Sequence, residues 1–432
     1  MLDRLIAIFA LIGICAFIFI TGALVTYFRI PPGILITEAF EGGEAWWNNL
    51  STDIPEKPAK IKKSKIKTIE GKPFKPIWDK NAAYDGYTLV CQESFTKAEL
   101  IDMSGKVVHA WNMPFNKAWP KPRHTTPTVK AKIFFDKCHV FPNGDLLIQY
   151  TGLGDTPYGY GLAKINKDSK LIWKYSANVH HDFYVSTQNG TIYTLTHEMI
   201  KTPPQGTKGL KFPILVDFIV TLDKDGKELS KLSILDAFMS SEFASLLYYK
   251  KDGAKKYTWN HFHTNSIMAL EPEIAEVFPQ FKSGQVLISL RNSGILAVVD
   301  LNTKKVVWAV SGHWKMQHDA KFLPTGNIGL FDNQGFYYNG KDYSRALIID
   351  PLTTKPIWYY TGQDTKSIYS EFHGRIQYLP NGNLLITSSL QRYIVEVTPD
   401  KNIAWEYRLP PKPQNGILSG TRYAKDALTF MQ

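Results

Sequence analysis

Short strand-like runs of apolar and polar residues recur between about residues 87 and 408, and their pattern predicts β-structure. A full unit has a strand that ends in a Pro-Asn-Gly or Thr-Gly turn, an apolar strand, and a strand of the form Ile-Asp-x-x-x-Lys-x-x-Trp. Glycine supplies the backbone freedom that these turns need. The turn glycines are Gly144, Gly190, Gly284, Gly326 and Gly382, and the closing tryptophans are Trp111, Trp173, Trp308, Trp358 and Trp405.

The spacing of the turns predicts a six-bladed β-propeller. Successive turn glycines lie 46, 94, 42 and 56 residues apart, and a period in the forties fits a blade of four short strands. The long interval contains residues 236–262, whose helix-like stretch and Lys-rich turn indicate a decoration between blades. The first blade is a weak copy of the unit. That weakness fits a closed ring in which strands from both chain ends complete one blade.

An apolar segment near the N-terminus predicts a membrane anchor. Residues 5–28 carry no charge over 24 positions, which exceeds the ~20 residues that cross a bilayer. A cleaved signal peptide has a shorter apolar region of ~7–15 residues, so we expect an uncleaved signal anchor within residues 1–30. The charges of Asp3 and Arg4 nearly cancel before the helix, so the positive-inside rule gives only a weak indication of the orientation of the helix in the membrane. Because such an anchor usually exports a long β-domain, we expect the propeller on the periplasmic or extracytoplasmic side.

Composition divides the rest of the chain into three parts. We expect a Lys/Pro-rich tether over residues 31–85, the propeller over 86–410, and a C-terminal extension packing on the propeller over 411–432. Residues 57–80 hold +7 of the formal net charge of +11. Because the positive charge is concentrated there, a nucleic-acid partner is not expected. A solvated spacer is favoured, with anionic lipid headgroups as the second interpretation.

The three cysteines decide little. Cys15 lies inside the predicted membrane helix, whereas Cys91 and Cys138 either pair in an exported domain or remain buried thiols. No Cys-x-x-Cys occurs, which removes support for zinc-ribbon and thioredoxin-like chemistry.

Histidines at the starts of blades carry the functional argument. They are His181, His263, His318 and His373. The innermost strands of a propeller begin near its central channel, so equivalent positions of different blades converge there. Each histidine alone is explained by capping a turn or bonding a neighbouring blade. Four histidines at equivalent places, together with Asn265 and Arg291, indicate a functional site.

The residue types favour an anion at this site. Neutral imidazoles are common metal ligands, but the permanent guanidinium of Arg291 repels a cation. The same group binds sulfate, phosphate or carboxylate through two parallel hydrogen bonds. Asn265 adds a neutral donor. We therefore expect no metal among these residues, and no cofactor.

Several stretches resemble the bacterial arylsulfate sulfotransferase (arylsulfotransferase, ASST) family. They are HTN, LISLRNSGILAVVDLNTKKVVWAVSG, QHDAKFLPTGNIGLFDN, SRALIID and LPNGNLLIT. The similarity covers residues 87 to about 410 in organisation and is specific over 261–385. It implies a six-bladed propeller enzyme that moves a sulfuryl group from an aryl sulfate ester to a phenolic acceptor, without a phosphosulfate donor. The absence of a Gly-Lys-Ser/Thr phosphate loop agrees with this.

The resemblance also implies roles for individual residues. His318 matches the nucleophile that becomes transiently sulfated. His263 and Asn265 match the family's His-x-Asn, and Arg291 matches its active-site arginine. His181 corresponds less closely to the remaining histidine.

Other matches are less specific. His180 is the alternative to His181 as the remaining histidine of the family. We expect His180, like His373, to contact substrate. Asp332 and Asn333 are expected to fix turns, and Arg345 to form an ion pair between blades.

The expected chemistry is a ping-pong reaction through a sulfohistidine. Imidazole, with an unperturbed pKa of ~6.5, is largely neutral at pH 7, and a phenol leaving as phenoxide, of pKa ~10, benefits from a general acid. We expect a protonated His181 or His263 to be that acid. Trp314 and residues 336–338 (Phe-Tyr-Tyr) are candidates for stacking on an aryl ring, although most aromatic residues in a propeller belong to the core.

Two other function classes compete with the enzyme. A quinone-dependent dehydrogenase normally has more blades and an acid-rich calcium site, which this sequence does not show. The main alternative is a non-catalytic, membrane-anchored propeller that acts as a binding or assembly scaffold, which needs no convergent His, Asn and Arg. The segment between Arg291 and His318 is short for the family, so the identities of donor and acceptor stay open, as does the oligomeric state.

Overall fold

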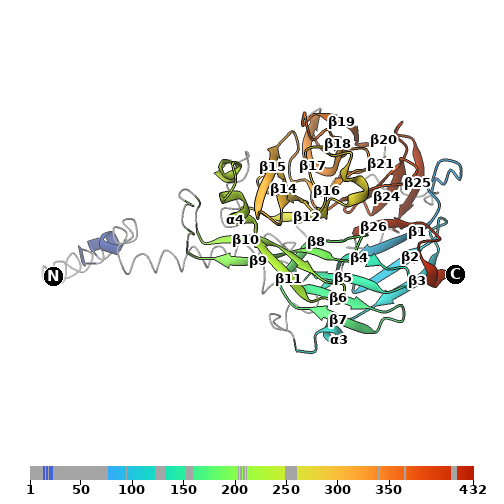
Figure 1. Ribbon diagram of the computed structural model, residues 1–432, viewed down its shortest axis with the longest axis horizontal. Coiled ribbons are helices and arrows are strands. Elements are labelled where there is room, and N and C mark those ends of the chain that lie inside the picture. Colours follow the sequence, from blue (N-terminus) through green and yellow to red (C-terminus); the bar gives the residue numbers. More distant parts are fainter. Residues whose placement is uncertain are drawn as a thin grey trace, which may run out of the picture. The chain divides into compact units, whose positions relative to one another are not determined.

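The computed structural model of the protein describes residues 13–14, 16–17, 19–22, 76–93, 95–121, 133–151, 159–202, 204, 207, 210, 212–248, 260–338, 341–363, 366–409 and 416–432, without the side chains of 336–338, 341–342 and 366. The chain separates into two compact units, Met1–Lys60 and Ile61–Gln432. The second unit contains the propeller (Figure 1).

Six four-stranded antiparallel sheets, counted over the described residues, form the predicted six blades. Blade 1 contains β26 (Ile417–Tyr423), β1 (Tyr87–Gln92), β2 (Lys97–Ile101) and β3 (Val107–Asn112). Blade 2 contains β4 (Phe134–Val140), β5 (Leu146–Thr151), β6 (Gly161–Ile165) and β7 (Leu171–Tyr175). Blade 3 contains β8 (Val179–Val185), β9 (Ile192–Ile200), β10 (Ile214–Leu222) and β11 (Glu228–Ser233).

The other three blades repeat this order. Blade 4 contains β12 (Thr264–Ala269), β13 (Val286–Leu290), β14 (Ile295–Asp300) and β15 (Lys305–Ser311). Blade 5 contains β16 (His318–Phe322), β17 (Ile328–Tyr338), β18 (Lys341–Ile349) and β19 (Pro356–Tyr360). Blade 6 contains β22 (Arg375–Tyr378), β23 (Leu384–Ser388), β24 (Tyr393–Val397) and β25 (Ile403–Arg408). The first-named strands of neighbouring blades lie against one another and form the inner ring.

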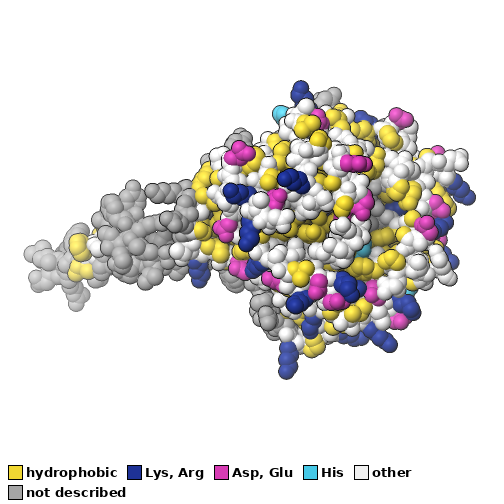
Figure 2. All heavy atoms as spheres, in the orientation of Figure 1, with side chains coloured by type: hydrophobic (Ala, Val, Ile, Leu, Met, Phe, Trp, Pro, Cys, Tyr) yellow, Lys and Arg dark blue, Asp and Glu magenta, His cyan; other side chains and the backbone are white. Residues whose placement is uncertain are grey.

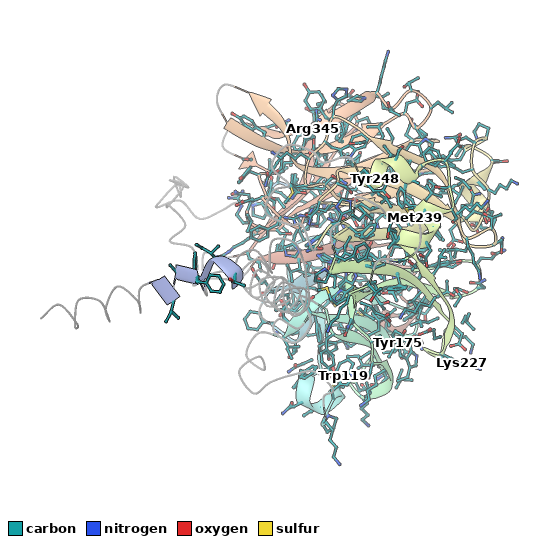
Figure 3. All side chains as sticks on the ribbon, turned by 90° about the vertical axis from the view of Figure 1, so that its left-hand side faces the viewer. Trp119, Tyr175, Lys227, Met239, Tyr248 and Arg345 are labelled. Atoms are coloured by element: carbon teal, nitrogen blue, oxygen red, sulfur yellow. A yellow bond between two sulfur atoms is a disulfide. The ribbon has the colours of Figure 1, made fainter. Side chains whose placement is uncertain are left out.

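Short elements decorate the blades. They are α3 (Phe115–Ala118), α4 (Ile234–Met239), η2 (Ala244–Tyr248), α5 (Pro272–Ala275), η4 (Thr429–Met431) and the hairpin of β20 (Gly362–Gln363) and β21 (Lys366–Ser367). The α4 and η2 elements lie in the predicted decoration between blades 3 and 4. There the Tyr248 hydroxyl approaches the Met239 sulfur at 3.9 Å, and Figure 3 shows the two side chains together.

Hydrophobic cores lie between the blades. Each buried cluster combines residues of two adjacent sheets, and the clusters follow the ring around. Successive side chains of a strand point to opposite faces of the sheet, so each sheet packs against both neighbouring blades. The outermost strands, such as β7 and β11, are largely exposed. The outer surface carries intermixed acidic and basic side chains over the face that Figure 2 shows.

Three closing tryptophans of the repeat, Trp111, Trp358 and Trp405, donate hydrogen bonds to the next blade. Trp111 of blade 1 donates its indole N–H to the Gly144 carbonyl of blade 2 at 3.0 Å. Gly144 lies in the repeat's turn with φ of 84°, the left-handed region that favours glycine. Trp405 of blade 6 donates to the Met103 carbonyl of blade 1 at 2.8 Å. In both pairs the tryptophan of one blade bonds a turn of the next: the Pro-Asn-Gly turn for Trp111, and the turn between β2 and β3 for Trp405.

The two chain ends complete blade 1, as the weak first repeat predicts. Strand β26 pairs antiparallel with β1, with Tyr423 opposite Tyr87. Its residues come from the segment expected to be an extension packing on the propeller, and they form the inner strand instead. Arg422 of this strand pairs with Glu396 of blade 6 at 3.1 Å, and both side chains are fully buried. This ion pair fastens the closing strand to the last blade.

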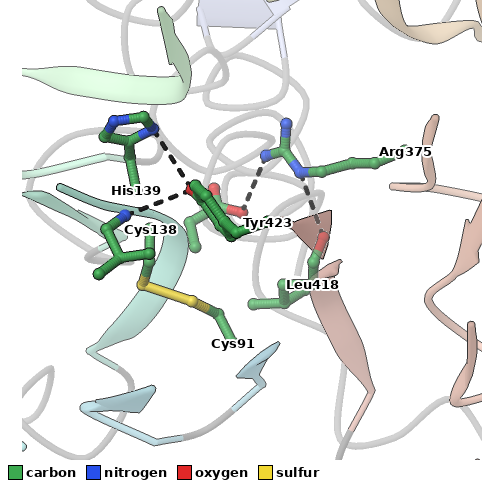
Figure 4. Close-up of a disulfide and its surroundings, with 8 residues drawn as sticks. Cys91, Cys138, His139, Arg375, Leu418 and Tyr423 are labelled. Atoms are coloured by element: carbon green, nitrogen blue, oxygen red, sulfur yellow. Dashed lines mark hydrogen bonds and ion pairs between the residues drawn. A yellow bond between two sulfur atoms is a disulfide. The ribbon is translucent and has the colours of Figure 1, made fainter. Parts of the chain in front are cut away.

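A disulfide fastens the other side of blade 1. Cys91 on β1 is bonded to Cys138 on β4 of blade 2 (Figure 4). The two possibilities that the sequence left open are thus resolved in favour of pairing. Nearby, the Tyr423 hydroxyl lies 3.4 Å from His139 Nδ1, which links the closing strand to blade 2 as well.

The end of the predicted tether pairs with the propeller. Trp78 forms an antiparallel bridge with Trp405 on β25, and the Asp79 N–H donates to the Ala404 carbonyl at 2.9 Å. Of the predicted membrane helix, residues 13–14, 16–17 and 19–22 are helical. Within the part of the chain that the structure describes, no helix is long and apolar enough to span a bilayer. The membrane anchor stays a prediction, since most of it lies outside the described residues.

Candidate functional site

The starts of the inner strands have an unusual backbone. His181, His263, Asp319 and His373 have φ values of 57°, 49°, 53° and 58°, in the left-handed region that side chains with a Cβ avoid. The strand register also shifts at the starts of β8, β12 and β16. Such bulges re-aim side chains and are common beside active sites. The four blades thus share a strained backbone at equivalent places, which turns side chains toward the channel.

Of these four residues, His181, Asp319 and His373 line one small cavity. Its lining residues are His181, Asn265, His318, Asp319, His373, Gly374 and Arg375. The ring centroids of His181 and His263 lie 4.7 Å apart, and those of His318 and His373 lie 6.0 Å apart. The predicted convergence of the repeat-equivalent histidines is therefore present in the structure.

Hydrogen bonds fix the protonation of the His318 ring. Its Nδ1 lies 3.0 Å from the Met316 carbonyl oxygen and 2.7 Å from Asn333 Oδ1. A carbonyl only accepts, so Nδ1 carries the proton. The Asn333 orientation agrees, since its Nδ2 donates to the carbonyls of Ser370 and His373 at 2.7 and 2.6 Å. In the neutral ring, Nε2 is then the nitrogen with the lone pair.

Asn333 is thus a positioning residue for His318, beyond the turn-fixing role that the sequence suggested. The neighbouring Asp332 does fix a turn, because it accepts from the backbone N–H groups of Lys315 and Gly335 at 3.0 and 2.8 Å. Asp332 also pairs with Arg345 at 2.8 Å. The two residues face each other across β17 and β18. The prediction of an ion pair between blades is wrong, because strand register places both groups in blade 5.

Arg291 lies beside the histidines. It follows β13, and its backbone N–H donates to the His263 carbonyl at 3.2 Å. Burial, followed by the charge of Arg291, holds the pKa of His263 and of His318 well below the usual value. The charge of Arg291 also lowers the pKa of His373, although burial is the larger cause there. Arg291 is not among the residues that line the cavity, so its positive charge acts on these histidines from beside it.

His263 and Asn265 are held by short hydrogen bonds. Asn260 Nδ2 lies 2.8 Å from His263 Nδ1, and an amide nitrogen only donates, so His263 presents Nε2–H. Asn265 donates from Nδ2 to the Gln317 carbonyl at 2.7 Å, which ties β12 to the residue before His318. The bond from Asn265 to the residue before His318 places these two side chains, from adjacent blades, side by side.

The two adjacent histidines of β8 have different surroundings. His181 lines the cavity, whereas His180 is fully buried behind it, with the two Nδ1 atoms 2.8 Å apart. His181 is therefore the residue in the site, and the expected contact of His180 with substrate is not supported. Burial, followed by the charges of His263 and other histidines, holds the pKa of His181 well below the usual value. In the substrate-free site we expect neutral His181 and His263, which corrects the expectation of a protonated acid.

A cluster of charged side chains beside the cavity escaped the sequence analysis. Asp182 accepts from Lys137 at 2.5 Å and from Arg375 at 3.2 Å. Arg375 also lies 3.4 Å from Asp319 and donates to the His181 carbonyl at 3.0 Å. The signal was present in the repeats, because an aspartate follows both His181 and His318. The cluster joins blades 2, 3, 5 and 6 through side chains.

Ionisation of the cluster is maintained by its own members. Burial raises the pKa of Asp182, but Lys137, Lys321 and Arg375 outweigh burial and hold that pKa well below the usual value. Burial lowers the pKa of Lys137 to about 8. Both groups are therefore charged at neutral pH.

The expected stacking residues do not line the cavity where the structure describes them. Trp314 is 1% exposed, packs in the core between blades 4 and 5, and donates its indole N–H to the Gly294 carbonyl at 3.0 Å. It is a core residue. The side chains of residues 336–338 lie outside the described part of the chain.

The structure is a six-bladed propeller with a cavity lined by His, Asn and Arg side chains from several blades. The chain belongs to the arylsulfotransferase (ASST) family, whose model matches residues 137–409. Membership of this family supports a transferase activity of the arylsulfotransferase type in general. Among curated proteins, none is significantly similar in sequence.

Solved structures are only distantly similar. A protein of unknown function from Bacteroides caccae is 11% identical over 75% of this chain and 93% of its own, with a TM-score of 0.47. Virginiamycin B lyase from Staphylococcus aureus is 9% identical over 78% of this chain and 85% of its own, with a TM-score of 0.40. Similarity at this level carries no argument about function.

The charged cluster predicts a large stability effect at Asp182. Asp182→Asn removes the acid that Lys137 and Arg375 share, and breaking a buried pair in this way costs about 3–5 kcal/mol. The exposed Asp168, 3.0 Å from Lys167, provides a matched control, since Asp168→Asn should change stability by at most about 1 kcal/mol. Urea unfolding of the three proteins measures both values. Equal stabilities for the two variants would show that the cluster is not needed for the fold.

Proposed function

We propose that the protein transfers a sulfuryl group from an aryl sulfate ester to a phenol, through a sulfohistidine at His318. The observation that carries this proposal is the fixed tautomer of His318. Its Nδ1–H is held by Met316 and Asn333, so the Nε2 lone pair is available to attack sulfur. Family membership supports aryl sulfate and phenol as the general substrate class.

The first half-reaction replaces an oxygen–sulfur bond with a nitrogen–sulfur bond. His318 Nε2 attacks the sulfur, the bond from sulfur to the aryl oxygen breaks, and its electron pair leaves with the phenoxide. Arg291, His263 Nε2–H and Asn265 hold the sulfuryl oxygens. This is catalysis by positioning and charge stabilisation, as in phosphoryl transfer.

A proton must accompany the leaving phenoxide. The negative ester counteracts burial and the charge of Arg291, so substrate binding favours proton uptake by His181 or His263. That histidine then donates its proton to the phenoxide oxygen and becomes neutral. In the second half-reaction it takes the proton of the accepting phenol, whose oxygen attacks sulfur as the bond to His318 Nε2 breaks. When the product leaves, this histidine releases that proton to solvent, which balances the proton taken up at substrate binding, so the enzyme ends unchanged and needs no cofactor.

The covalent intermediate is directly testable. Brief exposure of the detergent-solubilised protein to 4-nitrophenyl sulfate or 4-methylumbelliferyl sulfate should leave an acid-labile sulfuryl adduct on His318, which added phenol discharges. Intact-mass measurement and peptide mapping detect it. His318→Ala should form no adduct, while His109→Gln, on the outer strand β3, should behave like the wild type. If no adduct and no phenol appear with several aryl sulfates, the alternative of a non-catalytic binding or assembly propeller is favoured.

The depressed pKa of His318 predicts an acid-tolerant nucleophile. Protonation removes the Nε2 lone pair, and the pKa of this ring in the folded protein lies well below the ~6.5 of a free imidazole. With 4-nitrophenyl sulfate, whose stabilised phenoxide needs little help from the general acid, the rate of adduct formation should therefore stay constant from roughly pH 8 to 6.5 and fall only at lower pH. Arg291→Gln removes a positive charge, so it should move this acid limb to higher pH and also weaken substrate binding. An acid limb centred at or above about pH 6.5 in the wild type would contradict the proposed environment.

We also propose that the propeller is exported and held at the membrane by the N-terminal helix. The bond between Cys91 and Cys138 supports this, because disulfides persist in oxidising compartments. Peptide mapping under non-reducing conditions, after alkylation in intact cells, should recover the linked cysteine peptides. Protease added outside the inner membrane should digest the propeller, and carbonate washing should leave the chain in the membrane. Free thiols and a protected propeller would overturn the proposal.

A further inference from the structure

Three polar side chains form a second cluster inside blade 3, behind the cavity. His180 on β8, His197 on β9 and Asp217 on β10 come from three adjacent strands. Their nitrogen and carboxylate atoms all lie within 4.8 Å of one another. Their exposures are 0%, 2% and 0%. The cluster is part of neither the proposed reaction nor the charged cluster around Asp182.

The strand register brings these groups together. Asp217 lies directly opposite His197 in the pairing of β10 with β9. The rings of His180 and His197 pack with centroids 4.7 Å apart, and His180 Nε2 lies 3.5 Å from Asp217 Oδ1. Backbone hydrogen bonds of one sheet hold all three residues, which gives the rigid support that a metal site needs.

The two oxygens of Asp217 have different surroundings. Oδ2 accepts the backbone N–H of Thr264 at 2.7 Å, across the boundary to blade 4. Oδ1 faces the histidines and, within the described part of the chain, accepts no hydrogen bond. A buried carboxylate oxygen is costly unless a positive charge or donor compensates it. A cation between Oδ1 and the two imidazoles would supply that compensation.

We propose that His180, His197 and Asp217 bind a divalent transition-metal ion, for which zinc is the probe. Two imidazoles and one carboxylate are a donor set that suits zinc and related ions. Zinc holds nitrogen and oxygen ligands at ~2.0–2.2 Å, so small side-chain rotations bring the three atoms onto one ion. The expectation of no metal came from Arg291, which lies among the channel histidines rather than in this cluster.

The proposed ion has a structural task beside the active site. A metal-bound imidazole usually donates its other N–H to a neighbouring acceptor, which fixes the ring. His180 Nδ1 lies 2.8 Å from His181 Nδ1, so a metal on His180 Nε2 would orient His181 through this bond. His180 is then a ligand and a positioning residue, and His181 remains the group at the cavity. The ion itself takes no part in the bond changes at sulfur.

The test is direct metal analysis of the full-length protein. Elemental analysis of protein purified without added metal, followed by removal with a chelator and titration with Zn²⁺, should give a single tight site. Zn²⁺ should raise the melting temperature by several degrees, and Co²⁺ should give ligand-field absorption. Asp217→Asn, which keeps an acceptor for the Thr264 N–H, and His197→Gln should each weaken Zn²⁺ binding at least tenfold. His139→Gln, at a half-buried histidine of blade 2, should bind like the wild type.

The outcomes separate this proposal from the transferase. Failure of the wild-type protein to bind Zn²⁺ or Co²⁺ overturns the metal site, whether or not the variants fold and whatever happens at His318. Binding that survives in both Asp217→Asn and His197→Gln also overturns it, since the metal then lies elsewhere. A sulfuryl adduct on His318 that forms without metal leaves the proposal intact, because the ion has no chemical role there.

Discussion

The ion pair between Asp182 and Arg375 is the interaction on which the centre of the propeller depends. Asp182 belongs to blade 3 and Arg375 to blade 6, which lie three blades apart in a ring of six, yet their side chains meet at 3.2 Å. Arg375 also donates to the Leu418 carbonyl of blade 1 at 3.2 Å (Figure 4). A single arginine thereby connects blade 6 to blade 3, with which it shares no core, as well as to its neighbour blade 1.

The aspartates of this cluster also order the inner strands. Asp182 accepts the backbone N–H of Ile267 in blade 4 at 2.9 Å, and Asp319 accepts that of Ile376 in blade 6 at 2.8 Å. The repeat thus places an acidic group where it bonds the next blade, and the cations Lys137, Lys321 and Arg375 compensate the buried charge. These charges compensate one another locally, while Arg291 acts mainly on His263 and His318.

Much of the fold followed from periodicity, because turns and closing tryptophans repeat wherever one blade contacts the next. The closing strand β26 did not, since its sequence, ILSGTRY, carries neither the turn nor the tryptophan. The convergence of histidines was predictable from their equivalent places. Asn333 and Arg375 were not identified as site residues, because their contacts depend on side chains from other blades. Composition likewise did not decide whether Cys91 pairs with Cys138, because pairing depends on β1 and β4 lying close together in the fold.

The adjacent residues His180 and His181 show why sequence alone could not assign the site histidine. Successive side chains of a strand point to opposite faces, so one of the pair faces the channel and the other the interior of the blade. Sequence does not reveal which, because the bulge at the start of β8 changes the local register. The structure turns His181 to the cavity and His180 toward Asp217. In the proposed reaction His181 contacts substrate, whereas His180, one residue earlier in the strand, has surroundings that suit a metal.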